Sequence, residues 1–397
     1  MPRSTFRFAT LTSLAVCMAL AVGVQPGAQS KGGAQAPAFQ VDPLWPRPLP
    51  DHWILGSVTG VVVDSRDHIW LVHRGADSLN ARQEMGLATN PPGSEFCCRP
   101  APFVLQFDPA GKVVSHWGGP GDGYEWPRSP GGMAIDASGN VWIAAAGSAD
   151  TAGGRGRGTG RGGAPTPATP AAPPRPQDAH VLKFSPSGKF LLQIGRAGKN
   201  EASETTLNRP LGLTVDVKAN EVYVADTGNR RIVVFDAANG AFKRQWSAHG
   251  AGDDPNTHFR NASCVKLSND GLVYVCDRQN NRIQVFKKDG TFVKQAFVEK
   301  STLGDGAVWD IAFSRDPKQQ FAYVADGQNQ RVHVLRRDTL DVVTSFGGGG
   351  RIPGYFFGVG SIAVDSKGNV YTGETYEGKR LQRFLFKGVA AVKGGTR

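Results

Sequence analysis

Short apolar runs separated by Gly, Asn and Asp turns recur along the whole chain. Each copy starts with an apolar strand that ends in Asp or Ser and passes through a tight turn. A second strand follows that is rich in β-branched and aromatic residues. Runs of this length, bounded by turn residues, predict β-strands. The six copies start at residues 58–72, 131–144, 211–226, 263–277, 310–326 and 360–374.

The copies are evenly spaced once two inserts are removed. The residues that end the first strand of each copy lie 72, 80, 52, 46 and 51 positions apart. The first interval contains the insert 76–101 and the second contains 148–177, and without them these two intervals become 46 and 50. A period near 50 with four strands per unit is typical of a β-propeller blade. The markers are Asp64, Asp136, Asp216, Ser268, Ser314 and Asp365.

The repeat predicts an all-β fold, a six-bladed β-propeller of four-stranded antiparallel blades. The last copy has only three strands and ends near Phe386. We expect the N-terminal segment at 39–41 to supply the missing outer strand and to close the ring, because closure removes exposed strand edges. The predicted organisation is a signal peptide at 1–30, an N-terminal segment with the closing strand at 31–55, the propeller at 56–387 and a tail at 388–397.

The first thirty residues have the pattern of a Sec-type signal peptide. Arg3 and Arg7 precede a mostly apolar run at 11–24, and small residues stand before a cleavage point after Ser30. We therefore expect a secreted or periplasmic protein with no membrane span after cleavage. A retained anchor is less consistent with an apolar run this short.

The formal net charge of +11 taken alone suggests an anionic partner, so we ask where along the chain the positive charges lie. The signal segment and the insert 148–177 together account for five of these charges. That insert is rich in Gly, Pro and Arg but contains no aromatic side chain on which a base could stack. We expect an exposed linker there and no nucleic-acid partner.

Four cysteines remain after signal cleavage. Cys97 and Cys98 are adjacent, so they could form a vicinal disulfide, pair with the others or ligate a metal. The strand register places Cys264 opposite Cys276, where either a disulfide or two buried thiols would fit. An exported protein can oxidise such pairs.

The repeat text VYVADTGNRRIVVFD and VYVCDRQNNRIQVF resembles NHL repeats. The resemblance covers residues 56–387. Among NHL-repeat proteins, the chain resembles the six-bladed peptidyl-α-hydroxyglycine α-amidating lyases and their bacterial relatives. The residues that carry it are the HRG motif at 73–75, the CDRQNNRIQVF run from Cys276, and the WGG and FGG motifs at Trp117 and Phe346.

This resemblance implies a zinc ion held by three histidines on the innermost strands of blades two, four and six, with a tyrosine and arginines nearby. Those three positions are Gly131, Ser263 and Gly360 here, and the expected tyrosine motif has Thr227 and Gly228. None of these residues can take the place of a histidine imidazole as a zinc ligand. Zinc chemistry is therefore not expected, and no cofactor is predicted, although zinc or calcium stays an alternative.

Our first hypothesis is an exported NHL propeller that binds a small anionic ligand or a peptide on its loop-rich face. Arg74 and Arg278 survive from the implied set, and we name them with His73 as ligand-binding candidates. One alternative is a metal-dependent lyase of the α-amidating type with a metal re-sited on His73, His249 and His258. A second alternative is a scaffold for a protein partner.

Two further repeated positions have a structural interpretation. Trp or Tyr recurs at one position of the second strand, which predicts packing between blades. An acidic residue recurs at the end of the same strand, at Asp226, Asp277 and Asp326. We expect it to cap a turn. We expect the arginine that follows to pair with backbone or with an acid between blades, and these arginines are Arg231, Arg282 and Arg331.

Overall fold

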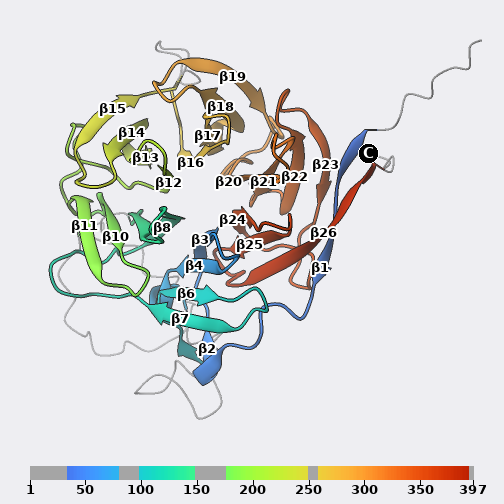
Figure 1. Ribbon diagram of the computed structural model, residues 1–397, viewed down its shortest axis with the longest axis horizontal. Helices are drawn as coiled ribbons and strands as arrows, with labels where there is room; N and C mark the ends of the chain where they lie inside the picture. Colours follow the sequence, from blue (N-terminus) through green and yellow to red (C-terminus); the bar gives the residue numbers. More distant parts are fainter. Residues whose placement is uncertain (1–33, 80–97, 148–175, 249–257, 393–397) are drawn as a thin grey trace, which may run out of the picture. The chain divides into compact units, whose positions relative to one another are not determined.

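The six repeats fold into six sheets of four antiparallel strands, arranged as the blades of a propeller (Figure 1). The computed structural model describes residues 34–79, 98–147, 176–248 and 258–392, all within the unit Ala34–Arg397. Apart from short 3-10 turns, the regular structure in these residues is strand, which confirms the all-β prediction. The predicted signal peptide and most of the insert 148–177 lie outside the described residues.

Each of the first five blades uses four strands in chain order, with β5 (Arg99–Pro100) left out of blade 1, and its first strand is innermost and contacts the innermost strands of both neighbours. Blade 1 consists of β3 (Val58–Val63), β4 (Ile69–His73), β6 (Val104–Phe107) and β7 (Val113–Trp117). Blade 2 consists of β8 (Pro130–Ile135), β9 (Val141–Ala145), β10 (His180–Phe184) and β11 (Phe190–Gly195). Blade 3 consists of β12 (Gly212–Asp216), β13 (Glu221–Asp226), β14 (Arg231–Asp236) and β15 (Phe242–Trp246).

Blades 4 and 5 repeat this order without an insert. Blade 4 consists of β16 (Ala262–Leu267), β17 (Val273–Asp277), β18 (Arg282–Phe286) and β19 (Phe292–Phe297). Blade 5 consists of β20 (Asp310–Phe313), β21 (Phe321–Asp326), β22 (Arg331–Arg336) and β23 (Val342–Phe346). A separate short parallel pair joins β2 (Trp53–Ile54) to β5 (Arg99–Pro100).

Blade 6 is closed by the N-terminal strand, as predicted. It consists of β24 (Val359–Val364), β25 (Val370–Glu374), β26 (Leu381–Ala391) and β1 (Gln35–Asp42). Phe39 of β1 lies opposite Phe386, and its ring packs 5.4 Å from that of Tyr323 in blade 5. Because β26 continues to Ala391, the first residues of the predicted tail belong to this blade.

The large aromatic residue at the centre of each second strand is fully buried. This confirms that the position packs between blades. Its polar tip is hydrogen-bonded in several blades: Trp70 Nε1 donates to Asp64 at 3.0 Å, and Tyr371 donates to Asp365 at 3.0 Å. The six residues are Trp70, Trp142, Tyr223, Tyr274, Tyr323 and Tyr371.

In blades 3 and 4 the side chain at the end of the second strand fixes the loop that leads into the innermost strand. Asp277 Oδ1 accepts the N–H groups of Arg260 and Asn261, at 2.9 and 3.3 Å, and its Oδ2 accepts Arg282 Nε at 2.8 Å. Asp226 pairs with Arg231 in the same way, at 2.8 Å. The prediction that the arginine pairs with an acid or with backbone is therefore confirmed in blades 3 and 4, although the acid belongs to the same blade.

Blade 5 departs from this pattern. Asp326 Oδ2 lies 3.0 Å from His333 Nε2, while the Arg331 side chain is exposed. The expected Arg331 partner is therefore wrong. The reason is that β22 buries His333 beside the carboxylate and leaves Arg331, its first residue, at the surface.

Both inserts begin after the second strand of a blade, and their described ends lie beside segments that lead into innermost strands. Ser78 Oγ accepts Ser57 N–H at 2.9 Å ahead of β3, and Asp178 Oδ2 accepts Ser129 N–H at 3.1 Å ahead of β8. The inserts therefore start from the face on which the innermost strands begin. None of the helical segments in the described residues has the length and apolar character needed to cross a bilayer.

Candidate functional site

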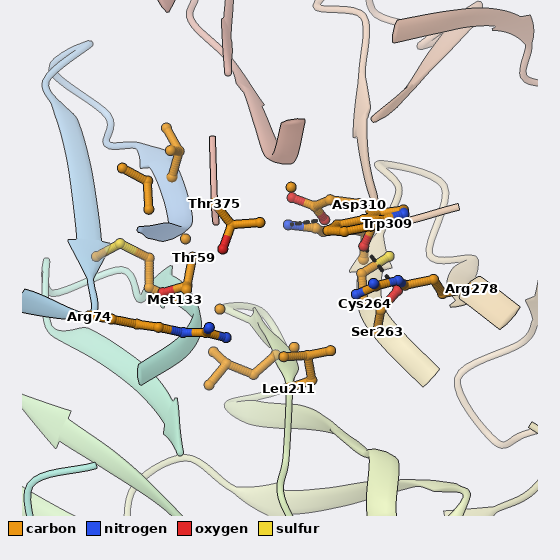
Figure 2. Close-up of a pocket in the computed structure, with 18 of the residues that line it drawn as sticks. Thr59, Arg74, Met133, Leu211, Ser263, Cys264, Arg278, Trp309, Asp310 and Thr375 are labelled. Atoms are coloured by element: carbon orange, nitrogen blue, oxygen red, sulfur yellow. Dashed lines mark hydrogen bonds and ion pairs between the residues drawn. The ribbon is translucent and has the colours of Figure 1, made fainter. Parts of the chain in front are cut away.

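A pocket with about 700 Å³ of free space, part of it open to solvent, lies where the innermost strands begin (Figure 2). All six innermost strands contribute to it. Apolar side chains such as Met133, Leu211 and Trp309 form much of its wall. The residues from successive innermost strands include Val58, Gly132, Gly212, Ser263, Asp310 and Gly360.

Arg74 enters the pocket directly after β4, and Arg278 lies on the other side of the space (Figure 2). Among the described residues, Arg74 has no carboxylate partner, and its Nε is buried without a hydrogen bond. Burial lowers the pKa of Arg74, nearby Tyr376 acts in the opposite direction, and Arg278 lowers the pKa further. A guanidinium keeps its charge despite such shifts, so Arg74 presents an uncompensated cation to the pocket.

Arg278 is held by three contacts on its own side of the pocket. Its Nη2 lies 2.8 Å from Asp305 Oδ2, and its Nε donates to the Asp305 carbonyl at 2.7 Å. The guanidinium carbon lies 3.4 Å from the ring centre of Trp309, which is a close cation–π stack. Asp305 therefore already neutralises this second arginine.

Tyr376 joins the same group from blade 6. Its hydroxyl donates to Asp305 Oδ2 at 2.7 Å, and its ring meets Trp309 edge-on with the ring centres 5.8 Å apart. Burial and the hydrogen bond to Asp305 raise the pKa of Tyr376, so the phenol stays neutral at physiological pH. Three neighbouring blades thus contribute to one linked cluster.

Lys266 and Asp310 form an ion pair deeper in the axial channel. Lys266 Nζ lies 3.0 Å from Asp310 Oδ1. The same carboxylate accepts the N–H groups of Ile311 at 2.9 Å and Ile362 at 3.0 Å, so it links the innermost strands of blades 4, 5 and 6. Lys266 also lines the opening of the channel on the opposite face, which places this pair between the two openings.

His73 is buried in the wall of blade 1 and does not line the pocket. Its Nδ1 accepts the N–H groups of Gly56 and Gly75, both at 3.0 Å, and its Nε2 donates to the Pro102 carbonyl at 2.8 Å. Burial lowers the pKa of His73 to about 4. Both ring nitrogens therefore hold backbone, and His73 supports the turn that carries Arg74.

The positions implied for zinc do not fit the metal. Gly131 and Gly360 offer no side-chain ligand, and Ser263 Oγ donates to the carbonyls of Trp309 at 2.9 Å and Val308 at 3.1 Å. Across the described ranges, no group of three His, Cys, Asp or Glu residues is arranged to hold a metal. His249 of the alternative site with His73 and His258 lies outside those ranges.

Cys264 and Cys276 form a disulfide between β16 and β17, with their Cα atoms 5.0 Å apart. The predicted register is confirmed, and of the two alternatives the structure contains the bonded pair. Cys264 also lines the pocket. Cys98 is buried, whereas Cys97 lies outside the described residues, so the vicinal disulfide stays one of the alternatives named for this pair.

The sequence interpretation found Arg74 and Arg278 but missed Asp305, Trp309 and Tyr376. One signal for Tyr376 was present. It stands two residues after Glu374, as Gly228 stands two residues after Asp226, so the tyrosine sought in the third repeat has a counterpart in the sixth.

Comparison with known proteins agrees with this architecture. Residues 207–235 and 259–286 match the family model described as NHL repeat, and they span the first three strands of blades 3 and 4. The chain is a six-bladed propeller, and two of its six repeats match the NHL model.

Among curated proteins, this chain is similar to peptidylglycine alpha-amidating monooxygenase of Rattus norvegicus. The two are 27% identical over 248 residues, which is 59% of this chain and 21% of the relative. The monooxygenase B of Xenopus laevis is 27% identical over 254 residues, or 61% of this chain and 24% of the relative. The chain thus spans about a fifth to a quarter of the length of these relatives.

One solved structure has a similar fold at low sequence identity, and a second, with a lower TM-score, serves only as a comparison. A protein of unknown function from Bacteroides thetaiotaomicron superposes with a TM-score of 0.50 and 12% identity, covering 89% of this chain and 76% of that one. An inactive virginiamycin B lyase from Staphylococcus aureus, solved with quinupristin, gives a TM-score of 0.46 and 11% identity, covering 89% of both chains.

Proposed function

We propose that this chain is an exported NHL-repeat propeller that binds a small anionic ligand, or a peptide through a carboxylate, in the axial pocket. The observation that carries the proposal is Arg74, a charged guanidinium at a pocket with no carboxylate partner among the described residues. The zinc positions offer no ligands, so we do not extend the chemistry of the relatives to this chain.

The physical argument rests on the cost of a charge removed from water. A buried guanidinium without a partner has lost hydration and gained nothing in exchange. A carboxylate that enters the pocket would restore the missing interaction through charge-assisted hydrogen bonds, which are about twice as strong as neutral ones. The apolar wall at Met133, Leu211 and Trp309 suits a ligand whose remaining part is apolar.

Binding of 3-phenylpropanoate, an anion with an apolar body, tests the proposal by isothermal titration calorimetry. We expect Arg74→Gln to weaken binding by about tenfold or more, because a hydrogen bond to a charged group contributes about 1.5–3 kcal/mol. Arg66→Gln is the matched control, since Arg66 lies in the β3–β4 turn with its side chain 67% exposed. Equal affinity of both variants and the wild type would reject the role of Arg74.

Export is proposed on two features. The N-terminal thirty residues have a signal-peptide pattern, and the Cys264–Cys276 disulfide is of the kind that persists in oxidising compartments. Expression of the full chain in a secreting bacterium, followed by N-terminal sequencing, is the test. We expect the exported protein to start at Lys31, and an intact Met1 in the cytoplasmic fraction alone would contradict export.

A further inference from the structure

The charges around the pocket are nearly balanced. Arg74, Lys266 and Arg278 are the cationic side chains among the described residues that line it. Lys266 pairs with Asp310 at 3.0 Å, and Arg278 pairs with Asp305 at 2.8 Å. One positive charge, that of Arg74, is therefore left for a ligand.

The two carboxylates differ in how they could affect a ligand. Asp310 is almost fully buried and bonded to backbone N–H groups of two innermost strands, so it is a fixed part of the ring. Asp305 lies in the β19–β20 connection beside Arg278 and Tyr376, which line the pocket, and its side chain is 43% exposed. A second negative group that approaches Arg278 would therefore meet the charge of Asp305.

Asp305 is nevertheless held firmly in place. Its Oδ2 accepts Arg278 Nη2 and the Tyr376 hydroxyl, and its N–H donates to Gln328 Oε1 at 3.2 Å. Gly306, the next residue, has φ +76°, and an added Cβ would lie 1.9 Å from the Arg278 carbonyl oxygen. The loop therefore returns the carboxylate to the same position beside Arg278.

We propose that Asp305 is a specificity-determining residue that restricts the pocket to ligands with a single negative charge. A monoanion can pair with Arg74 without disturbing the cluster at Arg278. A dianion whose second charge reaches Arg278 meets the Asp305 carboxylate there and would have to displace it from both Arg278 and Tyr376. Like charges brought together in this way select against the wrong partner.

The inference rests on the proposed anion binding at Arg74, and a matched pair of probes separates the two claims. 3-Phenylpropanoate carries one carboxylate, and 2-benzylbutanedioate adds a carboxymethyl group to the same skeleton. Both are titrated calorimetrically at one fixed ionic strength, because salt screens such interactions. We expect the wild type to bind the monoanion about tenfold more tightly than the dianion.

Asp305→Asn keeps the shape of the side chain and removes its charge, which leaves Arg278 available to a second carboxylate. We expect the dianion to bind this variant about tenfold more tightly than it binds the wild type, and the preference to disappear or reverse. Asp289→Asn is the control for loss of one negative charge, since Asp289 is exposed in the β18–β19 turn. This control should keep the wild-type preference.

The outcomes are distinguishable. If the wild type does not bind the monoanion, or if Arg74→Gln binds it normally, the proposed function fails. If the monoanion binds through Arg74 but the wild type takes the dianion equally well, only the role of Asp305 fails. An Asp305→Asn variant that keeps the wild-type preference also overturns that role. The wild-type comparison remains decisive should the variant not fold, which circular dichroism would reveal.

Discussion

His73 holds backbone N–H groups and does not line the pocket, although the HRG motif made it a ligand-binding candidate. Its neighbour Arg74 lines the pocket, but His73 itself stands at the end of β4, where Asp226 and Asp277 stand in blades 3 and 4. Like them, it accepts N–H groups from the loop ahead of the innermost strand. Its equivalence to these aspartates follows from the repeat alignment and marks it as part of the frame.

This role predicts a pH dependence of stability. The folded chain holds the pKa of His73 at about 4, below its ordinary value of 6.5, because the ring is buried. As the pH falls from about 6.5 to 4, the unfolded chain gains a proton that the folded chain resists, so the free energy of unfolding decreases. The full difference corresponds to about 3 kcal/mol at His73.

Urea unfolding at pH 7 and pH 4.5 measures this effect. We expect the wild type to lose about 2 kcal/mol more between the two pH values than His73→Asn, which does not titrate. His116→Asn is the control, because His116 is exposed in β7 and should leave the pH dependence unchanged. A pH profile of His73→Asn that parallels the wild type would contradict the prediction.

At the level of elements, the strands were predictable and most of the connections were not. Strand order, blade number and the pairing of Cys264 with Cys276 follow from a repeat whose alternation and turns recur six times. Arg74 and Arg278 were named from the resemblance to the amidating lyases, and each directly follows the second strand of its blade. The strands themselves depend on a local pattern that recurs along the chain.

The remaining site residues lie in connections that differ from blade to blade. Asp305 and Trp309 belong to the segment between β19 and β20, whose path depends on positive φ angles at Gly304 and Gly306 and on contact with Arg278. Asp178 is a second example, because it follows the insert 148–177 directly and caps the loop ahead of β8. Such conformations depend on tertiary contacts, which the repeated sequence pattern does not reveal.

The whole molecule depends on one non-local pairing. Blade 6 takes three strands from the C-terminal part and β1 from the N-terminal part, so both ends of the described chain meet in one sheet (Figure 1). Arg383 and Asp42 form an ion pair across this junction, and Val392 N–H donates to the Ala34 carbonyl at 2.7 Å. The blade turns are also joined, since Asp67 Oδ1 accepts Ser366 N–H at 2.8 Å.

Phe39 is the side chain through which this closure can be tested. Its ring lies 5.4 Å from Tyr323, 5.1 Å from Phe346 and 6.0 Å from Phe386, so it joins blade 5 to both outer strands of blade 6. We expect Phe39→Ala to lower the free energy of unfolding by about 2 kcal/mol, less than for a fully buried ring because Phe39 is half-buried. Val389→Ala, on the facing strand but 53% exposed, is the control.

Removal of residues 34–42 applies the same logic to the whole strand. Without β1, the outer edge of β26 would have unpaired N–H and C=O groups, which are a template for association with other chains. Size-exclusion chromatography and urea unfolding of the truncated chain should show association and a broadened transition. A monomeric, cooperatively unfolding truncation, together with a Phe39→Ala variant as stable as Val389→Ala, would mean that the ring is held by its innermost strands alone.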